Sequence, residues 1–126
     1  MDNWKQIWSK KQLLSAGHRS LHDLIVADGF DTGVGSYDED SWREMVVDFL
    51  SRTNFTESSS VLELGCGSGA FLFALNDLVQ ADYFGLDYSS GLIDIARQAL
   101  PEAKFIAAEA NAPVFDDISF DIVFSH

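Results

Sequence analysis

The chain has 126 residues, of which 47% are hydrophobic and 22% charged, so it is long enough for one soluble domain with its own core. The formal net charge is −12. A surface this acidic repels phosphate backbones, which argues against general nucleic-acid binding.

Two further features concern the cellular compartment. No apolar run approaches the roughly 20 residues that span a bilayer, and no secretory leader pattern opens the sequence. The single cysteine, Cys66, has no partner for an internal disulfide. We therefore expect a cytoplasmic chain that does not enter a membrane.

Helical spacing of apolar residues predicts two helices, over residues 3–16 and 19–27, the second with Leu21, Leu24 and Ile25 turned inward. Residues 1–22 carry four basic side chains and one acid, which suits either a contact arm or a solvated helix face.

Residues 28–37 contain three glycines and no steady period, so we expect a loop there. A third helix is expected from Ser41, because Ser41 and Glu44 have the spacing of a capping box. Its apolar stripe comprises Trp42, Met45, Val46, Phe49 and Leu50.

From residue 60 onward, apolar strands alternate with helices. This alternation predicts an α/β fold, with a parallel sheet and helices on both faces. We divide the chain into an N-terminal helical part with a loop, residues 1–59, and an α/β part, residues 60–126. The expected strands are Ser60–Leu64, Asp82–Leu86, Lys104–Ala107 and Phe120–Phe124, and the expected helices are Gly69–Val79 and Ser90–Leu100.

The strongest chemical signal is the glycine-rich stretch at residues 61–69, VLELGCGSG, between a strand and a helix. Glycines let the backbone turn tightly and approach a ligand, and the following helix offers unpaired N–H groups. Glu63 stands two residues before the first glycine, and Asp87 closes the next strand. A carboxylate in the position of Asp87 can accept both hydroxyls of a ribose.

This arrangement resembles the class I S-adenosylmethionine-dependent methyltransferases over residues 60–126. The acid-x-Gly-x-Gly-x-Gly pattern is matched by Glu63, Gly65, Gly67 and Gly69, and the ribose-binding acid by Asp87. A third element is matched by Glu109–Ala110, where the family more often has Asp, and a fourth by Phe120–Phe124. The resemblance implies a Rossmann-like sheet in the order 3-2-1-4, without the family's C-terminal strands.

The resemblance also implies that S-adenosylmethionine is the cofactor. The glycine loop would cradle its amino-acid part, and Glu63 would help hold the ammonium end, directly or through water. Asp87 would hold the ribose diol, Tyr88 would lie along the adenine, and Glu109 with the Ala110 N–H would contact the adenine edge. The implied cofactor-binding residues are Glu63, Gly65, Cys66, Gly67, Ser68, Gly69, Asp87, Tyr88, Glu109 and Ala110.

Several of these residues also have purely structural interpretations. Tyr88 suits a helix-entry aromatic, and Cys66 a small loop residue, because no partner that would activate a nucleophile is identifiable. His18 and His22 have helical spacing but no further metal ligands, so no metal site is assigned. His126 either reaches a substrate pocket or is simply a chain end. The loop at 28–37, with Tyr37, is a candidate lid.

The reaction that the resemblance implies is transfer of a methyl group, and the acidic surface favours a small-molecule acceptor. No catalytic base is assigned. The alternative is a catalytically incomplete fragment that binds S-adenosylmethionine or another protein. A nicotinamide dehydrogenase fits less well, because its third glycine comes one residue later, where Ala70 stands. The fourth strand would be an exposed edge, which invites self-association.

Overall fold

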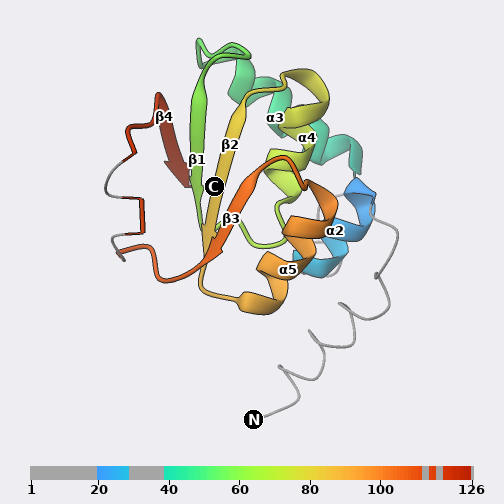
Figure 1. Ribbon diagram of the computed structural model, residues 1–126. Coiled ribbons are helices and arrows are strands. Elements are labelled where there is room, and N and C mark those ends of the chain that lie inside the picture. The colour runs from blue at the N-terminus through green and yellow to red at the C-terminus, as the bar shows by residue number, and fades with distance from the viewer. Residues whose placement is uncertain (1–19, 29–38, 112–113, 116–117, 126) are drawn as a thin grey trace.

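The computed structural model describes residues 20–28, 39–111, 114–115 and 118–125. They form a parallel sheet of four strands in the order β3-β2-β1-β4, packed against four helices (Figure 1). Both the fold class and the strand order expected from the sequence are confirmed. The expected helix at 3–16, the lid-like loop with Tyr37, His18 and His126 lie outside the described residues.

The boundaries of the elements agree closely with the expected ones, apart from the start of α3 and the last strand. β4 begins two residues later than expected, because residue 121 is used to join it to β1. The Asp121 carboxylate accepts from the Ser60 N–H at 2.8 Å, and the Asp121 N–H donates to the Ser60 carbonyl at 2.9 Å. The elements are α2 (Leu21–Asp28), α3 (Glu39–Ser51), β1 (Ser60–Leu64), α4 (Ala70–Leu78), β2 (Asp82–Asp87), α5 (Ser90–Ala99), β3 (Lys104–Ala107) and β4 (Ile122–Ser125).

All strand pairs are parallel, so the strands end at the same edge of the sheet. Glu63 of β1 lies beside Gly85 of β2, and Asp87 of β2 lies beside Ala107 of β3. The segments that follow β1, β2 and β3 therefore gather at one edge, which is where open parallel sheets bind ligands.

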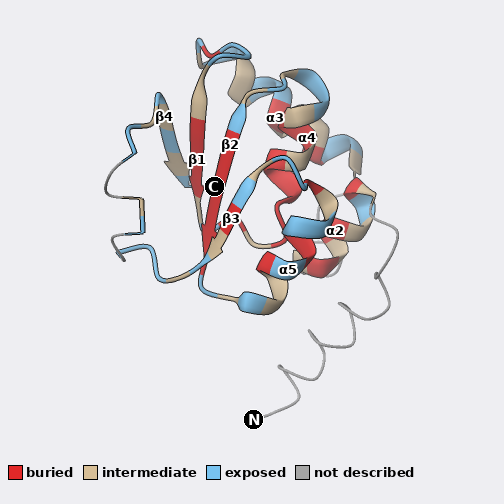
Figure 2. Cartoon of the chain, viewed as in Figure 1, coloured by how far each residue is buried: buried red, intermediate tan, exposed pale blue. Residues whose placement is uncertain are grey.

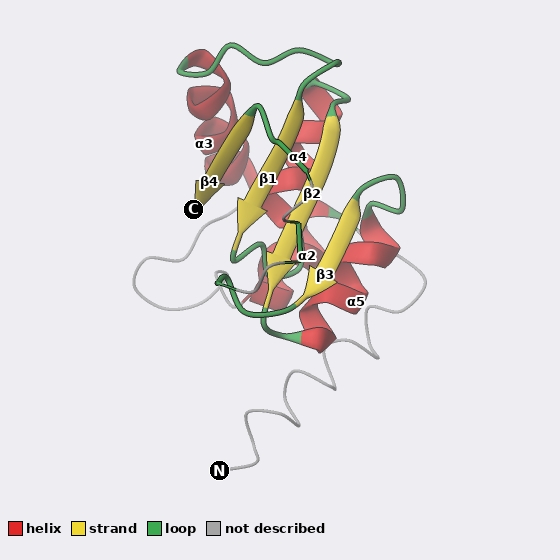
Figure 3. Ribbon diagram, turned by 60° about the vertical axis from the view of Figure 1, so that its left-hand side comes forward, coloured by secondary structure: helices red, strands yellow, loops and turns green. Residues whose placement is uncertain are grey.

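The four described helices form one layer on one face of the sheet (Figure 3). They contact one another as well as the strands, since α2 touches α3, α4 and α5. Helices were expected on both faces. Among the described residues the second face instead carries an aromatic cluster, in which Phe84 lies 5.7 Å from Phe115 and 4.9 Å from Phe120 between ring centroids.

The core lies between the helices and the two central strands (Figure 2). Its aromatic part includes Phe49 of α3, Phe71 of α4 and Phe124 of β4, with ring centroids 4.6–5.4 Å apart. These rings attach the edge strand to the helical layer. Buried aromatic pairs of this kind add about 0.5–1.5 kcal/mol each beyond the area that they bury.

One of the expected helix starts is wrong. α3 is already helical at Glu39, so Ser41 lies within its first turn and does not cap it. A reciprocal capping pair begins α2 instead. The Ser20 hydroxyl accepts from the Asp23 N–H at 3.2 Å, and the Asp23 carboxylate accepts from the Ser20 N–H at 3.1 Å. The inward-facing residues expected for this helix, Leu21, Leu24 and Ile25, are buried as expected.

Gly85 offers a direct test of core packing. A Cβ placed there would lie 2.6 Å from the Phe105 ring and 2.8 Å from the Cys66 sulfur, closer than real contacts allow. We expect Gly85→Ala to lower the free energy of unfolding by about 1–3 kcal/mol through overpacking, measured by urea denaturation. Val47→Ala on the exposed side of α3 is the control and should change it by less than about 0.5 kcal/mol. Equal stability of both variants would contradict the packing described.

Candidate functional site

The candidate site lies at the carboxyl edge of the sheet, in the loop between β1 and α4. The N–H groups of Gly65 and Cys66 both donate to the Leu86 carbonyl, at 2.7 and 3.0 Å, so the loop turns across the end of β2. The three glycines of the loop all have positive φ angles, of 72°, 57° and 82°. Such angles strain any residue with a side chain, which explains the glycines.

The three glycines also differ in the atoms that a side chain at each position would contact. A Cβ at Gly65 would have no atom within 4 Å, so this residue borders open space. A Cβ at Gly67 would lie 2.6 Å from the Asp28 carboxylate, and one at Gly69 would lie 3.1 Å from Ala96. Gly65 therefore leaves room for a ligand, Gly67 leaves room for a side chain of α2, and Gly69 lets α5 pack closely.

Asp87 ends β2 and binds the same loop. Its Oδ1 accepts from the Gly67 N–H at 3.1 Å, and its Oδ2 accepts from the Ser89 N–H at 2.9 Å. An ionised carboxylate has about four lone-pair positions, so Asp87 keeps capacity for further donors. Tyr88 follows it with 75% of its surface exposed, beside the start of α5.

Glu63 lies deeper, with 1% of its surface exposed. Burial raises its pKa well above the usual range, and the nearby carboxylates of Asp28 and Asp87 raise it further.

Asp28, the last residue of α2, is the member of the site that the sequence analysis missed. Its Oδ1 accepts from the Ser68 N–H at 2.8 Å, while the Ser68 hydroxyl donates to the Leu24 carbonyl at 2.9 Å. The loop is thus fastened to α2 at two points. No sequence pattern predicts these bonds, because 40 residues separate Asp28 from Ser68. An acidic residue before a glycine-containing segment is also common at the end of a helix.

The pKa of Asp28 is raised to about 7. Desolvation is the main cause and repulsion from Asp87 adds to it, whereas the hydrogen bonds from Ser68 oppose the rise. Part of the surface of Asp28 remains exposed, unlike that of Glu63. Asp28 therefore lies nearer to the surface than the carboxyl group of Glu63.

Cys66 occupies a buried position in the loop. Burial raises the pKa of its thiol, and the carboxylates of Glu63, Asp87 and Asp28 raise it further. A thiol held in this protonated state is a poor nucleophile, in agreement with its interpretation as a small loop residue.

Glu109 and Ala110 follow β3 and are exposed. The preceding Ala108 N–H donates to the Asp87 carbonyl at 2.9 Å, which joins this segment to the end of β2. The sequence-predicted site residues thus all lie on β1, on β2 or on the segments after β1, β2 and β3, toward one edge.

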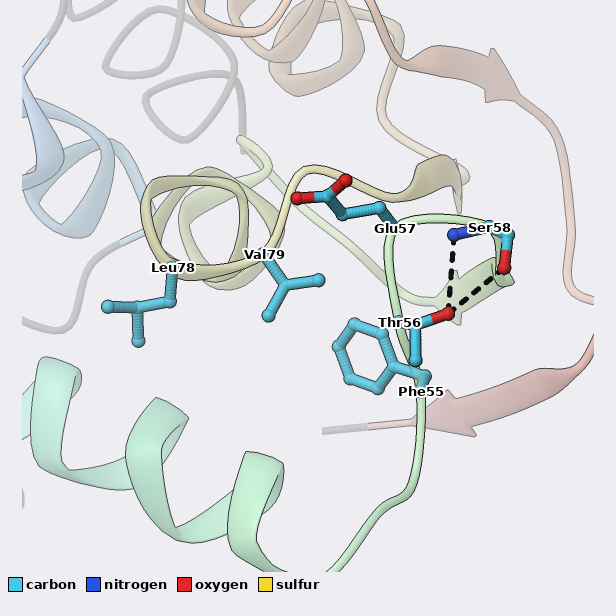
Figure 4. A pocket seen from close by; sticks show the side chains of 6 residues that line it. All are labelled: Phe55, Thr56, Glu57, Ser58, Leu78 and Val79. Carbon is cyan, nitrogen blue, oxygen red and sulfur yellow. Dashed lines mark hydrogen bonds between the residues drawn. The ribbon is translucent and has the colours of Figure 1, made fainter.

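A surface pocket lies at the opposite edge of the sheet from the candidate site, and none of the predicted site residues line it (Figure 4). Its lining comes from the segment before β1 and the end of α4. These residues are Phe55, Thr56, Glu57, Ser58, Leu78 and Val79.

The described part of the chain contains neither a metal-binding cluster nor a membrane-spanning helix. No group of three His, Cys, Asp or Glu side chains there could hold a metal ion, and His22 is exposed. None of the described helices is long and apolar enough to cross a membrane.

The raised pKa of Asp28 predicts a pH dependence of stability. Between about pH 4 and pH 7 the folded chain retains a proton that the unfolded chain has lost, so the free energy of unfolding falls as pH rises and levels off above pH 7. We expect Asp28→Asn to reduce this fall by about 2–4 kcal/mol, at 1.4 kcal/mol per pKa unit, in urea titrations at several pH values. Asp82→Asn, an exposed control at the other end of β2, should keep the wild-type profile. If the free energy of unfolding of Asp28→Asn depends on pH as it does in the wild type, Asp28 does not have a raised pKa.

A methyltransferase-domain family matches residues 61–126, slightly more than half of the chain. Among curated relatives, the demethylmenaquinone methyltransferase of Thermotoga maritima is 31% identical over 104 residues, which are 82% of this chain and 41% of that protein. The enzyme of the same name from Renibacterium salmoninarum is 33% identical over 82 residues, which are 65% of this chain and 33% of that protein. The chain thus spans about a third to two fifths of the length of these relatives.

Among solved structures, a SAM-dependent methyltransferase from Thiobacillus denitrificans, in complex with S-adenosyl-L-homocysteine, superposes with a TM-score of 0.56. It is 23% identical, and the match covers 65% of this chain and 35% of that one. Likeness at this identity supports the fold, while the family match covers the glycine loop, Asp87 and the β3 segment together. The chain belongs to the methyltransferase-domain family.

Proposed function

We propose that the chain binds S-adenosylmethionine at the carboxyl edge of its sheet. The position of Asp87 supports this most directly. It ends β2 beside the glycine loop, is bonded to the loop through Gly67, and has acceptor capacity left for a ribose diol. The family match and the S-adenosylhomocysteine bound by the Thiobacillus denitrificans neighbour support the same ligand.

The residues present fit such a ligand. It combines a ribose diol, an adenine, an amino-acid end and a sulfonium charge. The open space beside Gly65 leaves room at the loop, and the charged groups that the described part of the chain places near Glu63 are the carboxylates of Asp28 and Asp87. A positively charged ligand is favoured in such a field.

Individual roles follow from position. Asp87 accepts from the ribose hydroxyls, and exposed Tyr88 covers one side of the adenine. Glu109 accepts from the adenine amino group, with the Ala110 N–H nearby. The backbone of the loop from Gly65 to Gly69, including Cys66 and Ser68, lies against the amino-acid end of the ligand. The buried Glu63 helps to hold the ammonium group of that end, through water or by its charge.

We further propose that the protein transfers the methyl group to a small-molecule acceptor. S-adenosylmethionine, when bound, supplies a methyl group on a positively charged sulfur, and S-adenosylhomocysteine remains after transfer. The site contributes by fixing the cofactor in one orientation, since such transfers depend on holding the nucleophile close and in line. The acidic net charge and the curated relatives, named for a quinone-type acceptor, favour a small molecule over nucleic acid.

Calorimetric titration with S-adenosylhomocysteine tests the binding site. We expect Asp87→Ala to weaken binding by about 2–4 kcal/mol, because hydrogen bonds to a charged group are lost. This equals a rise in Kd of about 30- to 900-fold. Asp87→Asn, which keeps one carbonyl oxygen as acceptor, should lie between the wild type and the alanine variant.

The matched control is Asp82→Asn, which removes one exposed carboxylate at the opposite end of the same strand. It should bind like the wild type. Circular dichroism must show that all variants are folded. Unchanged affinity of a folded Asp87→Ala variant would refute the assigned ribose contact.

Methyl transfer is measured separately from binding, with a labelled methyl donor and a panel that includes a demethylmenaquinone analogue. Transfer that Asp87→Ala slows in parallel with its loss of affinity supports an enzyme. Cofactor binding without transfer to any acceptor of the panel would favour the alternative of a catalytically incomplete binding module.

A further inference from the structure

Asp28 reaches the glycine loop from outside the α/β unit. It ends α2, which lies in the helical layer beside α5 (Figure 1) and is bonded to Ser68 in the loop after β1. The carboxylate lies over Gly67, because a Cβ at that residue would meet Oδ1 at 2.6 Å, Cγ at 3.1 Å and Oδ2 at 3.3 Å. Asp28 therefore fills the place that a side chain at residue 67 would take.

The two carboxylates on α2 and β2 bind successive N–H groups of the loop. Asp87 accepts from the Gly67 N–H and Asp28 from the Ser68 N–H. The two side chains thus bind the peptide units on either side of the Gly67 Cα, and the third carboxyl group, that of Glu63, is close enough to both for their charges to affect its pKa. Within the described part of the chain, the bond from Ser68 occupies one of about four lone-pair positions of the Asp28 carboxylate.

The described arginine and lysine side chains are engaged elsewhere. Arg43 pairs with Glu39 and Asp77, and Arg52 pairs with Asp48. The other two lie near β3, where Arg97 pairs with Asp94 and binds the Phe105 carbonyl, and Lys104 lies over the Phe84 ring. Carboxyl groups held close together disfavour one another's ionisation, and a cationic ligand group would favour it.

We propose that Asp28 is a cofactor-binding residue that accepts a hydrogen bond from the ammonium group at the amino-acid end of S-adenosylmethionine. This rests on the proposed cofactor site and adds α2 to it. We place that end of the ligand beside Gly65, where a side chain would meet open space. The carboxylate of Asp28 lies over Gly67, two residues further along the loop. An ammonium group offers three donors and no acceptor, which suits a carboxylate with free lone pairs.

The role differs from that of the two other carboxyl groups. Asp87 lies at the end of β2, where the ribose is expected, and Glu63 is too deeply buried to touch a ligand directly. Asp28 keeps part of its surface exposed. It also links cofactor binding to the position of α2, because the Ser68 hydroxyl bonds the Leu24 carbonyl of the same helix.

Two ligands separate this role from general support of the loop. S-adenosylhomocysteine carries the amino-acid end, whereas 5′-methylthioadenosine has the same adenine, ribose and sulfur without it. We expect Asp28→Asn to raise the Kd for S-adenosylhomocysteine about 10-fold, because a charge-assisted bond becomes a neutral one. The Kd for 5′-methylthioadenosine should change less than about 2-fold. Asp82→Asn matches the change in net charge and should leave both Kd values unaltered.

The other outcomes overturn the proposal. Unchanged affinity of Asp28→Asn for S-adenosylhomocysteine shows that Asp28 does not bind the ligand. An equal loss of affinity of Asp28→Asn for both ligands shows that Asp28 only supports the loop. Tighter binding shows that Asp28 competes with the ligand for the Ser68 N–H.

Asp87→Ala in the same titrations keeps the proposed function separately testable. If Asp87→Ala loses affinity for both ligands while Asp28→Asn gives one of the three overturning results, the cofactor site stands and only Asp28 is removed from it. A folded wild-type chain that binds neither ligand overturns both the site and the role of Asp28.

A second readout is proton release on binding. Asp28 faces Asp87 of β2, Glu63 of β1 and the Cys66 thiol of the loop, and its pKa is about 7 without ligand. A bound ammonium group favours the ionised carboxylate, so binding at pH 6 should release a fraction of a proton. Titration in buffers of different ionisation enthalpy measures it. Release that persists unchanged in Asp28→Asn would overturn the contact.

Discussion

The site is organised around one residue of the loop, Gly67. Its own N–H is bound by Asp87 from β2, and the N–H of the next residue, Ser68, is bound by Asp28 from α2. These bonds hold together a strand end, a loop and a helix that are distant in the sequence. Only glycine fits at residue 67, because both the positive φ and the carboxylate above it exclude a side chain. A buried N–H must find an acceptor, and here carboxylates provide it.

This arrangement gathers three carboxyl groups beside the glycine loop. Burial is the main cause that raises the pKa values of Asp28, Glu63 and the Cys66 thiol, and neighbouring carboxylates raise them further, at a cost to stability near neutral pH. Costly groups of this kind concentrate at functional sites rather than in ordinary cores. The rest of the described chain follows ordinary packing, with a continuous core under the helical layer.

Much of the α/β part could be read from the sequence. Strands and helices alternate with clear apolar runs, and the expected bounds of β1 and β3 match residue for residue. The glycine spacing and the acid at the end of β2 located the edge of the sheet that carries the site. These signals are local, since each depends on residues a few positions apart. Less local features were missed, such as the start of α3 and the later start of β4 beside Ser60.

The sequence by itself therefore determined the fold class, the strand order, the family resemblance and the residues around the glycine loop. Only the tertiary structure decided that α2 reaches this loop and that Asp28, rather than a residue of the expected pattern, lies against Gly67. It also decided that Glu63 is buried while Tyr88 is exposed. The physical reason is distance along the chain: a bond between residues 40 positions apart depends on how the helical layer packs, and no local pattern encodes that packing.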